Sequence, residues 1–292
     1  MNKIVFYLMN EKGFHVLENF LKDFGPENIE YIVLAGDKNV RNDYYNEIRN
    51  LCVKYSINYL DRRTYIPIFK GYKFVIGWRW IIQDSSKLIV LHDSILPRYR
   101  GFAPLVNMLI NGESQIGVTA LFASNEYDKG DIIKQQTIPV IYPVKIQQAI
   151  ELVSNLYSKI INDISALIFN NENLVGIPQL EEDATYSLWR DDDDYFINWT
   201  SDSHCIRRKV DAVGYPYNGA KTYLNKEIII IDEVEEYPDL KIENRDSGKI
   251  IFMEDGLPII VCGQGALKIK SARYEDGKSI MPIKKFRSKF GG

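Results

Sequence analysis

Four short apolar runs in the first third of the chain place the strongest limit on its fold. They are KIVFYLM (3–9), IEYIVLAG (29–36), YKFVIGW (72–78) and KLIVLH (87–92). Each has the length of a strand and is apolar at almost every position, which is typical of strands buried on both faces of a sheet. Between the first two runs, apolar side chains repeat at helical spacing from Phe14 to Leu21 and stop at Gly25-Pro26. Strands and helices that alternate in this way predict an α/β domain.

The alternation continues through the first half of the chain. The further elements predicted there are helices over 41–54, 104–111 and roughly 146–169, and strands over 116–124 and 131–141. A sheet of such strands, covered on both faces, is expected to be mostly parallel. The chain lacks a G-x-G-x-x-G fingerprint after the first strand and any G-x-x-x-x-G-K-[ST] motif, so the usual dinucleotide and triphosphate sites are not indicated.

The pattern changes beyond about residue 185. A short helix over roughly 201–212 is followed by five β segments separated by turn residues. These segments read AKTYL, EIIIIDEV, GKIIFM, LPIIVC and ALKIKSA. They are typical of a small antiparallel sheet or barrel. We therefore expect two domains, over 1–185 and 186–292, which suits a chain of 292 residues.

Composition and charge exclude several classes of protein. The sequence is 46% hydrophobic and 26% charged, without an apolar run that could cross a bilayer, and its start reads as a buried strand rather than a signal peptide. A net charge of −3 argues against a surface built for nucleic acid. Cys52, Cys205 and Cys262 are widely spaced and are expected as free thiols. We expect a cytoplasmic protein that binds neither a membrane nor nucleic acid.

One histidine lies where an α/β sheet binds its ligands. His92 ends the fourth apolar run, at the carboxyl edge of the predicted sheet. Asp128 lies in the loop NEYDKG between two later strands, and neighbouring strand ends would bring the two together. A carboxylate so placed orients the imidazole and stabilises its protonated form, so that the pair can accept and return a proton. From position alone, a strand-end histidine bound to a backbone partner explains His92 equally well.

The stretch LHDSILPRYRGFAPLVNMLINGESQIGVTALFASNEYDKGDII (91–133) resembles the signature of the 10-formyltetrahydrofolate-dependent formyltransferases. Their pattern is Asn-x-His-x-Ser-x-Leu-Pro, then Arg-Gly, a Gly-Val-Thr strand and Asp-x-Gly-Asp. The matching residues are His92, Ser94, Leu96, Pro97, Arg100, Gly101, Pro104, Asn111, Gly112, Gly117, Val118, Thr119, Asp128, Gly130 and Asp131. The region INWTSDSHCIRRKVDAVGYPYNGAKTYLNKEIII (197–230) is similar to the second domain of the family. The resemblance implies a Rossmann-like formyltransferase domain and an OB-like C-terminal domain.

The resemblance also implies transfer of a formyl group from 10-formyltetrahydrofolate without a metal, with His92 and Asp128 as catalytic residues. In the family a third residue, an asparagine, helps to hold the developing oxyanion, and this chain has Val90 there. Loss of such a donor costs about 3–4 kcal/mol in well-studied enzymes. Another donor replaces it (Arg79, Gln83 or a backbone N–H), or a local bulge displaces the alignment, or the protein is a weak or retired enzyme. We favour a replacement donor, because the rest of the motif is retained.

Ligand contacts are expected from this motif and from the stretch GWRWII (77–82) before it. The folate is expected to contact Trp78, Trp80, Leu96, Tyr127 and Asp128. The second substrate is expected to contact Arg79, Ser94, Arg98 and Arg100. The stretch GWRWII (77–82) continues the third apolar run, and because neighbours on a strand face opposite ways, Trp78 and Trp80 share one face, where either can stack on a ring, while Arg79 takes the other. Core tryptophans and solvated loop arginines are the alternative interpretation.

The family acts on initiator methionyl-tRNA, on a sugar nucleotide or on glycinamide ribonucleotide. The tRNA enzymes carry a basic insertion after the second strand, where this chain reads AGDKNVRNDYYNEIRNL (35–51). GWRWII and RGFAPL (100–105) look more like the sugar branch. The resemblance thus implies a UDP- or dTDP-linked amino-deoxy sugar as acceptor, for bacterial surface glycans such as the O-antigen of lipopolysaccharide or decorated flagellin. Methionyl-tRNA formylation and a non-catalytic folate- or nucleotide-binding module are the alternatives, and the C-terminal domain is a candidate homodimer surface.

Overall fold

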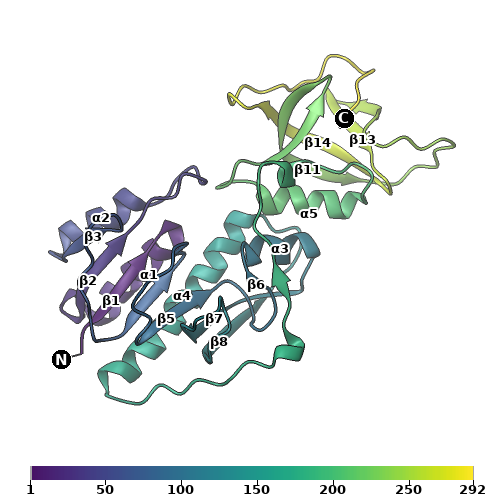
Figure 1. Ribbon diagram of the computed structural model, residues 1–292. Helices are drawn as coiled ribbons and strands as arrows, with labels where there is room; N and C mark the ends of the chain where they lie inside the picture. The colour runs from purple at the N-terminus through teal and green to yellow at the C-terminus, as the bar shows by residue number, and fades with distance from the viewer. Residues whose placement is uncertain (1, 292) are drawn as a thin grey trace. The chain divides into compact units, whose positions relative to one another are not determined.

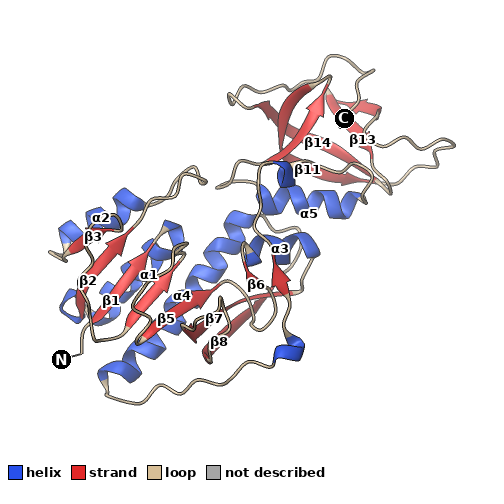
Figure 2. Ribbon diagram, in the orientation of Figure 1, coloured by secondary structure: helices blue, strands red, loops and turns tan. Residues whose placement is uncertain are grey.

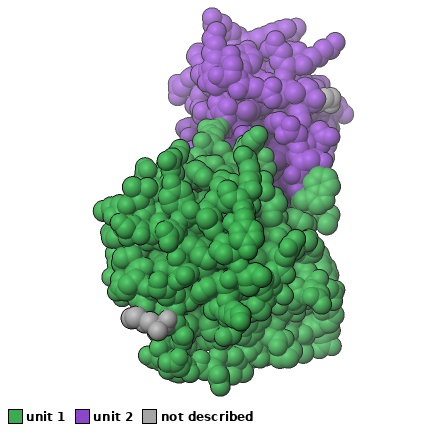
Figure 3. All heavy atoms as spheres, turned by 60° about the vertical axis from the view of Figure 1, so that its left-hand side comes forward, with its two compact units in different colours: residues 1–105, 114–140, 148–189 green, residues 106–113, 141–147, 190–292 purple. Residues whose placement is uncertain are grey.

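The computed structural model describes residues 2–291, which form two compact units (Figures 1 and 3). The first unit comprises the chain up to residue 105 together with 114–140 and 148–189. The second comprises 106–113, 141–147 and the chain from residue 190 onward. The last change of unit therefore lies four residues beyond the boundary placed at 185/186 from the sequence. The two short segments that the second unit takes from the first half carry no change in composition, so no sequence pattern indicated them.

The first unit is built on a seven-stranded sheet with the order β3-β2-β1-β4-β5-β7-β8 (Figure 2). Its strands are β1 (Ile4–Leu8), β2 (Ile29–Leu34), β3 (Tyr59–Asp61), β4 (Lys73–Ile76), β5 (Leu88–His92), β7 (Gln115–Phe122) and β8 (Ile132–Pro139). The first five pair in parallel, whereas β7 and β8 run antiparallel to their neighbours. The predicted mostly parallel α/β fold is confirmed. The edge strand β3 was not predicted, since three residues are too few to show a period.

The helices before residue 170 agree with the periodicity of the sequence. They are α1 (Asn10–Phe24), α2 (Tyr45–Lys54), α3 (Pro104–Asn111) and α4 (Ile146–Phe169), with 3₁₀ turns η1 (Pro26–Asn28) and η2 (Glu181–Asp183). Helix α2 begins four residues later than predicted. The side chains of Asn42 and Asp43 accept the backbone N–H groups of Tyr44 and Tyr45 (3.2 and 3.1 Å). Such local hydrogen bonds compete with a helix and hold the preceding segment in a turn.

The two faces of the sheet are covered differently. On one face, Phe6 of β1 packs its ring 5.0 Å from that of Phe20 in α1, and α1 is joined to α4 by a hydrogen bond from Asn19 to Ser158 (3.1 Å). The opposite face carries an apolar cluster formed by Val5, Tyr7, Tyr31, Val33, Val75 and Leu88. Side chains from irregular segments, including Ile66, Phe69, Trp78 and Ile82, pack against this cluster. Loop side chains therefore cover this apolar cluster on the second face.

The second unit contains a five-stranded antiparallel sheet with the order β10-β11-β14-β13-β12. Its elements are η3 (Asp193–Tyr195), α5 (Ser203–Val213), β10 (Ala220–Leu224), β11 (Glu227–Tyr237), β12 (Ile250–Glu254), β13 (Leu257–Val261) and β14 (Ala266–Tyr274). Near the C-terminus, the N–H groups of Phe290 and Gly291 donate to the carbonyls of Gly248 and Tyr223 (2.7 and 2.9 Å). The end of the chain thus joins the two edges of the sheet and partly closes it into a barrel. The predicted small β-rich domain is confirmed.

Three further observations concern the described residues 2–291. No helix there combines the length and apolarity that a membrane crossing requires. The same residues contain no cluster of three or more His, Cys, Asp or Glu side chains suited to a metal ion. Cys52, Cys205 and Cys262 are free thiols, as expected, and the first and last of these are buried.

Candidate active site

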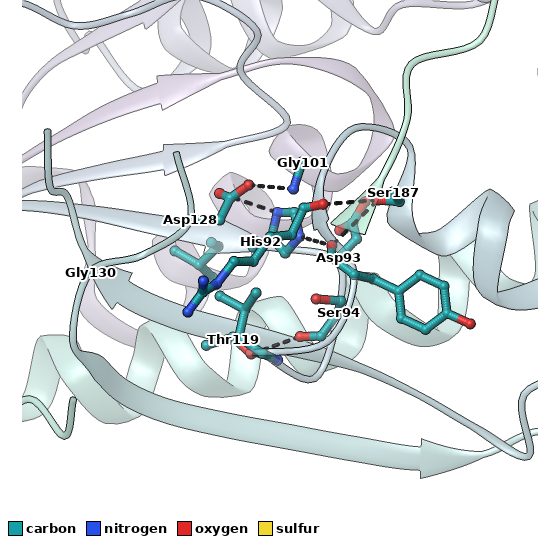
Figure 4. A network of polar contacts seen from close by, with 12 residues as sticks. His92, Asp93, Ser94, Gly101, Thr119, Asp128, Gly130 and Ser187 are labelled. Carbon is teal, nitrogen blue, oxygen red and sulfur yellow. Dashed lines mark hydrogen bonds and ion pairs between the residues drawn. The ribbon is translucent and has the colours of Figure 1, made fainter. Parts of the chain in front are cut away.

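The side chains of His92 and Asp128 meet at the carboxyl edge of the sheet (Figure 4). β5 ends at His92, and the loop between β7 and β8 carries Asp128. Nδ1 of the His92 ring lies 3.5 Å from Oδ1 of Asp128, and Nε2 lies 2.8 Å from the backbone carbonyl oxygen of Tyr99. The backbone N–H of Gly101 donates to Oδ2 of Asp128 (2.9 Å). Two residues that are 36 positions apart in the sequence are therefore in contact, and both side chains are largely buried.

Both nitrogens of the His92 ring face a hydrogen-bond acceptor. A neutral imidazole donates at one nitrogen and accepts at the other, so it can satisfy only one of these contacts. The imidazolium donates at both, and the carboxylate of Asp128 is its counter-ion. In this structure one ring nitrogen therefore faces a charged acceptor and the other faces a neutral one. The two explanations of His92 that the sequence left open, a backbone partner and a carboxylate partner, are both present at one ring.

The segment that follows His92 is anchored to the neighbouring strands. Oγ1 of Thr119, on β7, donates to the carbonyl of Ser94 (2.7 Å) and accepts the N–H of Leu96 (3.1 Å). Gln135, on β8, donates to the carbonyl of Leu96 (2.8 Å). The hydroxyl of Ser94 is fully buried and donates to the carbonyl of Arg98 (2.7 Å). Ser94, which we expected at the second substrate, thus uses its hydroxyl to shape the loop.

The two arginines of this loop lie in different environments. Arg98 is exposed, with its guanidinium 5.3 Å from the centre of the Tyr99 ring. Arg100 is 1% exposed, and its guanidinium donates to Gln179 and to Glu181. Arg98 is therefore accessible to a solute, whereas the donors of Arg100 are directed at other parts of the chain. Substrate contact by either arginine stays a prediction.

A buried ion pair lies directly behind the histidine. Asp93 forms a salt bridge with Lys12 of α1 and accepts the hydroxyl hydrogen of Tyr157 of α4. Burial alone would raise the pKa of Asp93, but the ammonium group of Lys12 and the Tyr157 hydroxyl outweigh it and hold that pKa below its ordinary value. Burial and the Asp93 carboxylate raise the pKa of Tyr157 well above its ordinary value, so its hydroxyl stays a donor. These contacts tie the end of β5 to two helices.

Val90, at the position of the family asparagine, lies in regular strand. β5 pairs with β4 from Lys73–Leu88 to Ile76–Leu91 without a register shift, and its pairing with β7 is equally regular. No bulge within these described strands displaces the alignment, which removes one of the three explanations for Val90. Its side chain packs against the apolar cluster that Trp78 and Ile82 also cover. The nature of a replacement donor stays open to experiment.

Val90→Asn is expected to lower the free energy of unfolding by about 1–3 kcal/mol, because it places an amide against apolar side chains. Chemical denaturation measures the change, with Val90→Ile as the apolar control. A variant as stable as the wild type would show that a polar partner for the amide exists at this position, contrary to the packing.

Trp78 and Trp80 do not lie on a strand. β4 ends at Ile76, and Gly77 has a left-handed backbone (φ 65°), so the expectation that the two tryptophans share one strand face is wrong. Their rings nevertheless contact each other edge to face, with centroids 5.4 Å apart. Arg79 forms an ion pair with the buried carboxylate of Asp37 (2.5 Å). The apolar run therefore extends beyond the end of β4. Trp78 is apolar because it packs on the apolar cluster from a loop, not because it belongs to the strand.

The predicted folate contacts differ in accessibility. Tyr127 is 68% exposed beside Asp128, and Trp80 is 37% exposed, with the guanidinium of Arg62 3.8 Å from its ring centre. Leu96 is buried, and Trp78 packs against Tyr7. Tyr127 and Trp80 therefore present aromatic surface to a solute, whereas Leu96 contributes to the packing beneath the site.

Sequence reasoning missed the segment that follows α4. Residues 186–187 form a short strand, β9 (Tyr186–Ser187), that pairs in parallel with β6 (Arg100–Gly101) next to the catalytic pair. The same segment contributes Gln179, whose amide contacts the loop of Asp128. No motif or period marks these residues, and their contacts join positions 49 to 88 residues apart. No sequence signal could have identified them.

Comparisons with known proteins agree with this architecture. Residues 63–161, which include both His92 and Asp128, match the formyl transferase domain, and residues 190–291 match the formyl transferase C-terminal domain. A methionyl-tRNA formyltransferase of Ralstonia nicotianae is 26% identical over 221 residues, which is 76% of this chain and 67% of that protein.

Two solved structures are similar over most of the chain. One is WlaRD, a sugar 3N-formyl transferase in the presence of dTDP and 5-N-formyl-THF, with a TM-score of 0.68, 19% identity and coverage of 92% of this chain and 97% of that one. The other is an N-formyltransferase from Helicobacter canadensis in complex with folinic acid and dTDP-3-aminofucose, with a TM-score of 0.68, 18% identity and coverage of 92% and 99%. Matches to both domains of one family, in the order of that family, account for most of the sequence. This chain belongs to the formyltransferase family.

Proposed function

We propose that this formyltransferase moves a formyl group from 10-formyltetrahydrofolate to the amine of an amino-deoxy sugar nucleotide. The observation that carries the proposal is the contact of His92 with Asp128 at the carboxyl edge of the sheet. The domain matches supply the reaction class. The acceptor class is supported by the fold similarity to two enzymes whose structures hold folates together with dTDP or a dTDP-amino sugar.

The proposed chemistry needs one proton acceptor that later becomes a donor. The neutral amine of the sugar attacks the formyl carbon, so that a new C–N bond forms and the formyl oxygen gains negative charge. The bond between that carbon and N10 of the folate then breaks, and the proton lost by the amine ends on N10. His92 carries this proton, while Asp128 stabilises the charged ring. Nδ1 of His92 faces Asp128, so the proton is exchanged at Nε2. The substrates would then take the place of the Tyr99 carbonyl as the hydrogen-bond partner of Nε2.

The side chains proposed to contact ligands are those that the structure leaves accessible. Tyr127 and Trp80 offer aromatic faces for the pterin or the aminobenzoyl ring of the folate. Arg98 and Arg79 are more than a third exposed and carry the positive charge that suits a pyrophosphate. We leave Ser94 and Arg100 out of the proposed substrate contacts, because both are buried and their polar atoms are bound to other parts of the chain, whereas Arg79 stays exposed beside Asp37.

Methionyl-tRNA formylation is the second candidate. The observation in its favour is the 26% identity to the tRNA enzyme of Ralstonia nicotianae. The net charge of −3 and the mixed charge of the segment 35–51 argue against it, because neutralising phosphates calls for an excess of Lys and Arg. A binding module without activity is the third candidate. It is supported by Val90, which stands where the family has an asparagine that helps to hold the oxyanion.

A panel of acceptors separates the three candidates. The purified chain is mixed with 10-formyltetrahydrofolate and, in separate reactions, with UDP- and dTDP-linked 3-amino and 4-amino sugars and with charged initiator tRNA. Mass spectrometry is expected to show one added formyl group on a sugar nucleotide. Formylation of the tRNA alone would overturn the proposed acceptor, and bound folate without any product would favour the binding module.

A further inference from the structure

The segment 176–187, which we call the return segment, is hydrogen-bonded to the loop that carries Asp128 and to the loop that follows His92. Ile177 exchanges two backbone hydrogen bonds with Ile132, at the start of β8 (2.8 Å each). At its other end, the carbonyl of Thr185 accepts the N–H of Arg100 (2.9 Å). The hydroxyl of Ser187 reaches the carbonyl of Tyr99 (3.4 Å), the same oxygen that faces His92 (Figure 4). The return segment thus links the loop of Asp128 to the loop that follows His92.

One side chain in this segment spans the two loops. The amide nitrogen of Gln179 donates to the carbonyls of Asp128 (2.7 Å) and Gly130 (2.8 Å). Its amide oxygen accepts two hydrogen bonds from Arg100, through Nε (3.1 Å) and Nη2 (2.9 Å). Both donors and both acceptor positions of the amide are therefore used. Arg100 is in turn held by Glu181 (2.8 Å), and it is among the largest fully buried side chains.

The loop that Gln179 binds has a backbone conformation that is unfavourable without support. Asp128 has a left-handed backbone (φ 57°), a conformation that few residues adopt without support from their surroundings. At Gly130 an added Cβ would lie 1.7 Å from the carbonyl oxygen of Phe122, so the loop passes very close to β7. The carbonyls that Gln179 binds flank this close approach. Its hydrogen bonds therefore fix the part of the loop that sets the direction of the Asp128 carboxylate.

We propose that Gln179 is a positioning residue for the reaction: it holds the Asp128 loop so that the carboxylate faces His92. This rests on the proposed formyl transfer, but its structural part can be tested separately. The amide nitrogen of Gln179 is directed at the backbone carbonyls of Asp128 and Gly130, so it acts on the carboxylate through the backbone of this loop. A displacement of about 1 Å in a catalytic group is enough to lower a rate about 100-fold. The expected effect therefore falls on kcat rather than on substrate binding.

A double-mutant cycle with Asp128 tests this role. Gln179→Leu keeps the size of the side chain and removes all four hydrogen bonds, and Gln179→Glu keeps the acceptor for Arg100 but sets a carboxylate oxygen against two carbonyls. Each is expected to lower kcat by about 10- to 100-fold, with the KM for the sugar nucleotide within about twofold of wild type. In an Asp128→Ala background the same changes are expected to cause no further loss. An additional loss of the same size in that background would overturn the proposal.

The matched control is Gln136→Leu. Gln136 lies on β8, is also half-buried and makes none of these four hydrogen bonds within the described chain. It is expected to leave kcat and KM unchanged. A loss of kcat in this control equal to that of Gln179→Leu would show a general effect of removing a glutamine near the site, and would count against the proposal.

A second readout does not depend on activity. The chain has only three histidines, so the ring signals of His92 in NMR spectra can be assigned by replacing His15 and His204. Gln179→Leu is expected to move the His92 ring signals toward their positions in Asp128→Ala, and Gln136→Leu to leave them in place. Unmoved signals would overturn the role of Gln179 even in an active enzyme. Conversely, a wild-type chain that formylates no sugar nucleotide would remove the proposed function, while the NMR result would still decide the positioning role.

Discussion

His92→Ala is expected to lower kcat for formyl transfer by two or more orders of magnitude, without loss of the fold. The ring supplies the group that takes and returns the proton, and removal of such a group costs about 10²- to 10⁴-fold. The ring is held by Asp128 and by the Tyr99 carbonyl rather than by apolar packing alone, so alanine leaves the strand pairing of β5 intact. Steady-state kinetics and circular dichroism of the purified variant measure both effects.

Two further variants define this result. Asp128→Asn preserves size and tolerates the left-handed backbone, but it removes the charge, and we expect a loss of kcat of the same order as for His92→Ala. His204→Ala is the matched control, since its imidazole is also paired with a carboxylate, Glu236 (2.6 Å), but lies exposed on α5. A kcat for His92→Ala equal to that of the control would remove His92 from the mechanism.

Lys12→Met is expected to lower the free energy of unfolding by about 3–5 kcal/mol at neutral pH, because it leaves a buried carboxylate without its counter-ion. Lys12 and Asp93 are each 14% exposed at the side chain, and without Lys12 the carboxylate keeps the hydrogen bond from the Tyr157 hydroxyl but loses its ammonium partner. Chemical denaturation measures the change. Lys22→Met on the same helix is the control, since Lys22 is exposed and its pair with Glu18 (3.7 Å) is worth at most about 1 kcal/mol.

The pH dependence of this deficit follows from the direction of the shift. In the wild type the pKa of Asp93 is lowered, so its contribution to stability is present above the unfolded pKa of about 3.9 and is lost as the pH falls toward the folded value. Without Lys12, burial raises that pKa, and protonation relieves the unpaired charge. The difference between wild type and Lys12→Met is therefore expected to begin to shrink above about pH 4, as Asp93 of the variant takes up its proton, and to shrink further below about pH 4 as the wild type loses its own contribution. A deficit no larger than that of Lys22→Met at neutral pH would contradict the role of the ion pair.

Much of the fold could be predicted from the sequence because most of its strands and helices have a clear local pattern of apolar residues. The runs that became β1, β2, β4 and β5 are apolar at nearly every position, and the apolar stripe of α4 marks both of its ends. Prediction failed where a local pattern was overridden. The run KFVIGW continues through Gly77, whose left-handed backbone ends β4, and the polar start of α2 is held in a turn by Asn42 and Asp43.

The site could be predicted only in part, for the same physical reason. His92 and Asp128 stand in a motif whose spacing is visible in the chain, and the structure brings them together. Gln179 and the Lys12–Asp93–Tyr157 contacts are not visible in the sequence, because each joins elements far apart along the chain through one side chain with no periodic partner. Arg100, which was expected to contact the substrate, is buried for the same reason: its partners Gln179 and Glu181 lie about 80 residues later in the chain.

The most direct test of the account follows an isotopic label. The wild-type chain is given tetrahydrofolate that carries a ¹³C-formyl group at N10, together with dTDP- and UDP-linked amino sugars, and the products are read by NMR and mass spectrometry. The proposed transfer predicts a labelled formamide on the sugar nitrogen and unlabelled tetrahydrofolate, formed by the wild type and lost with His92→Ala. Label that stays on the folate or appears only as formate, with every amino sugar unchanged, would contradict it.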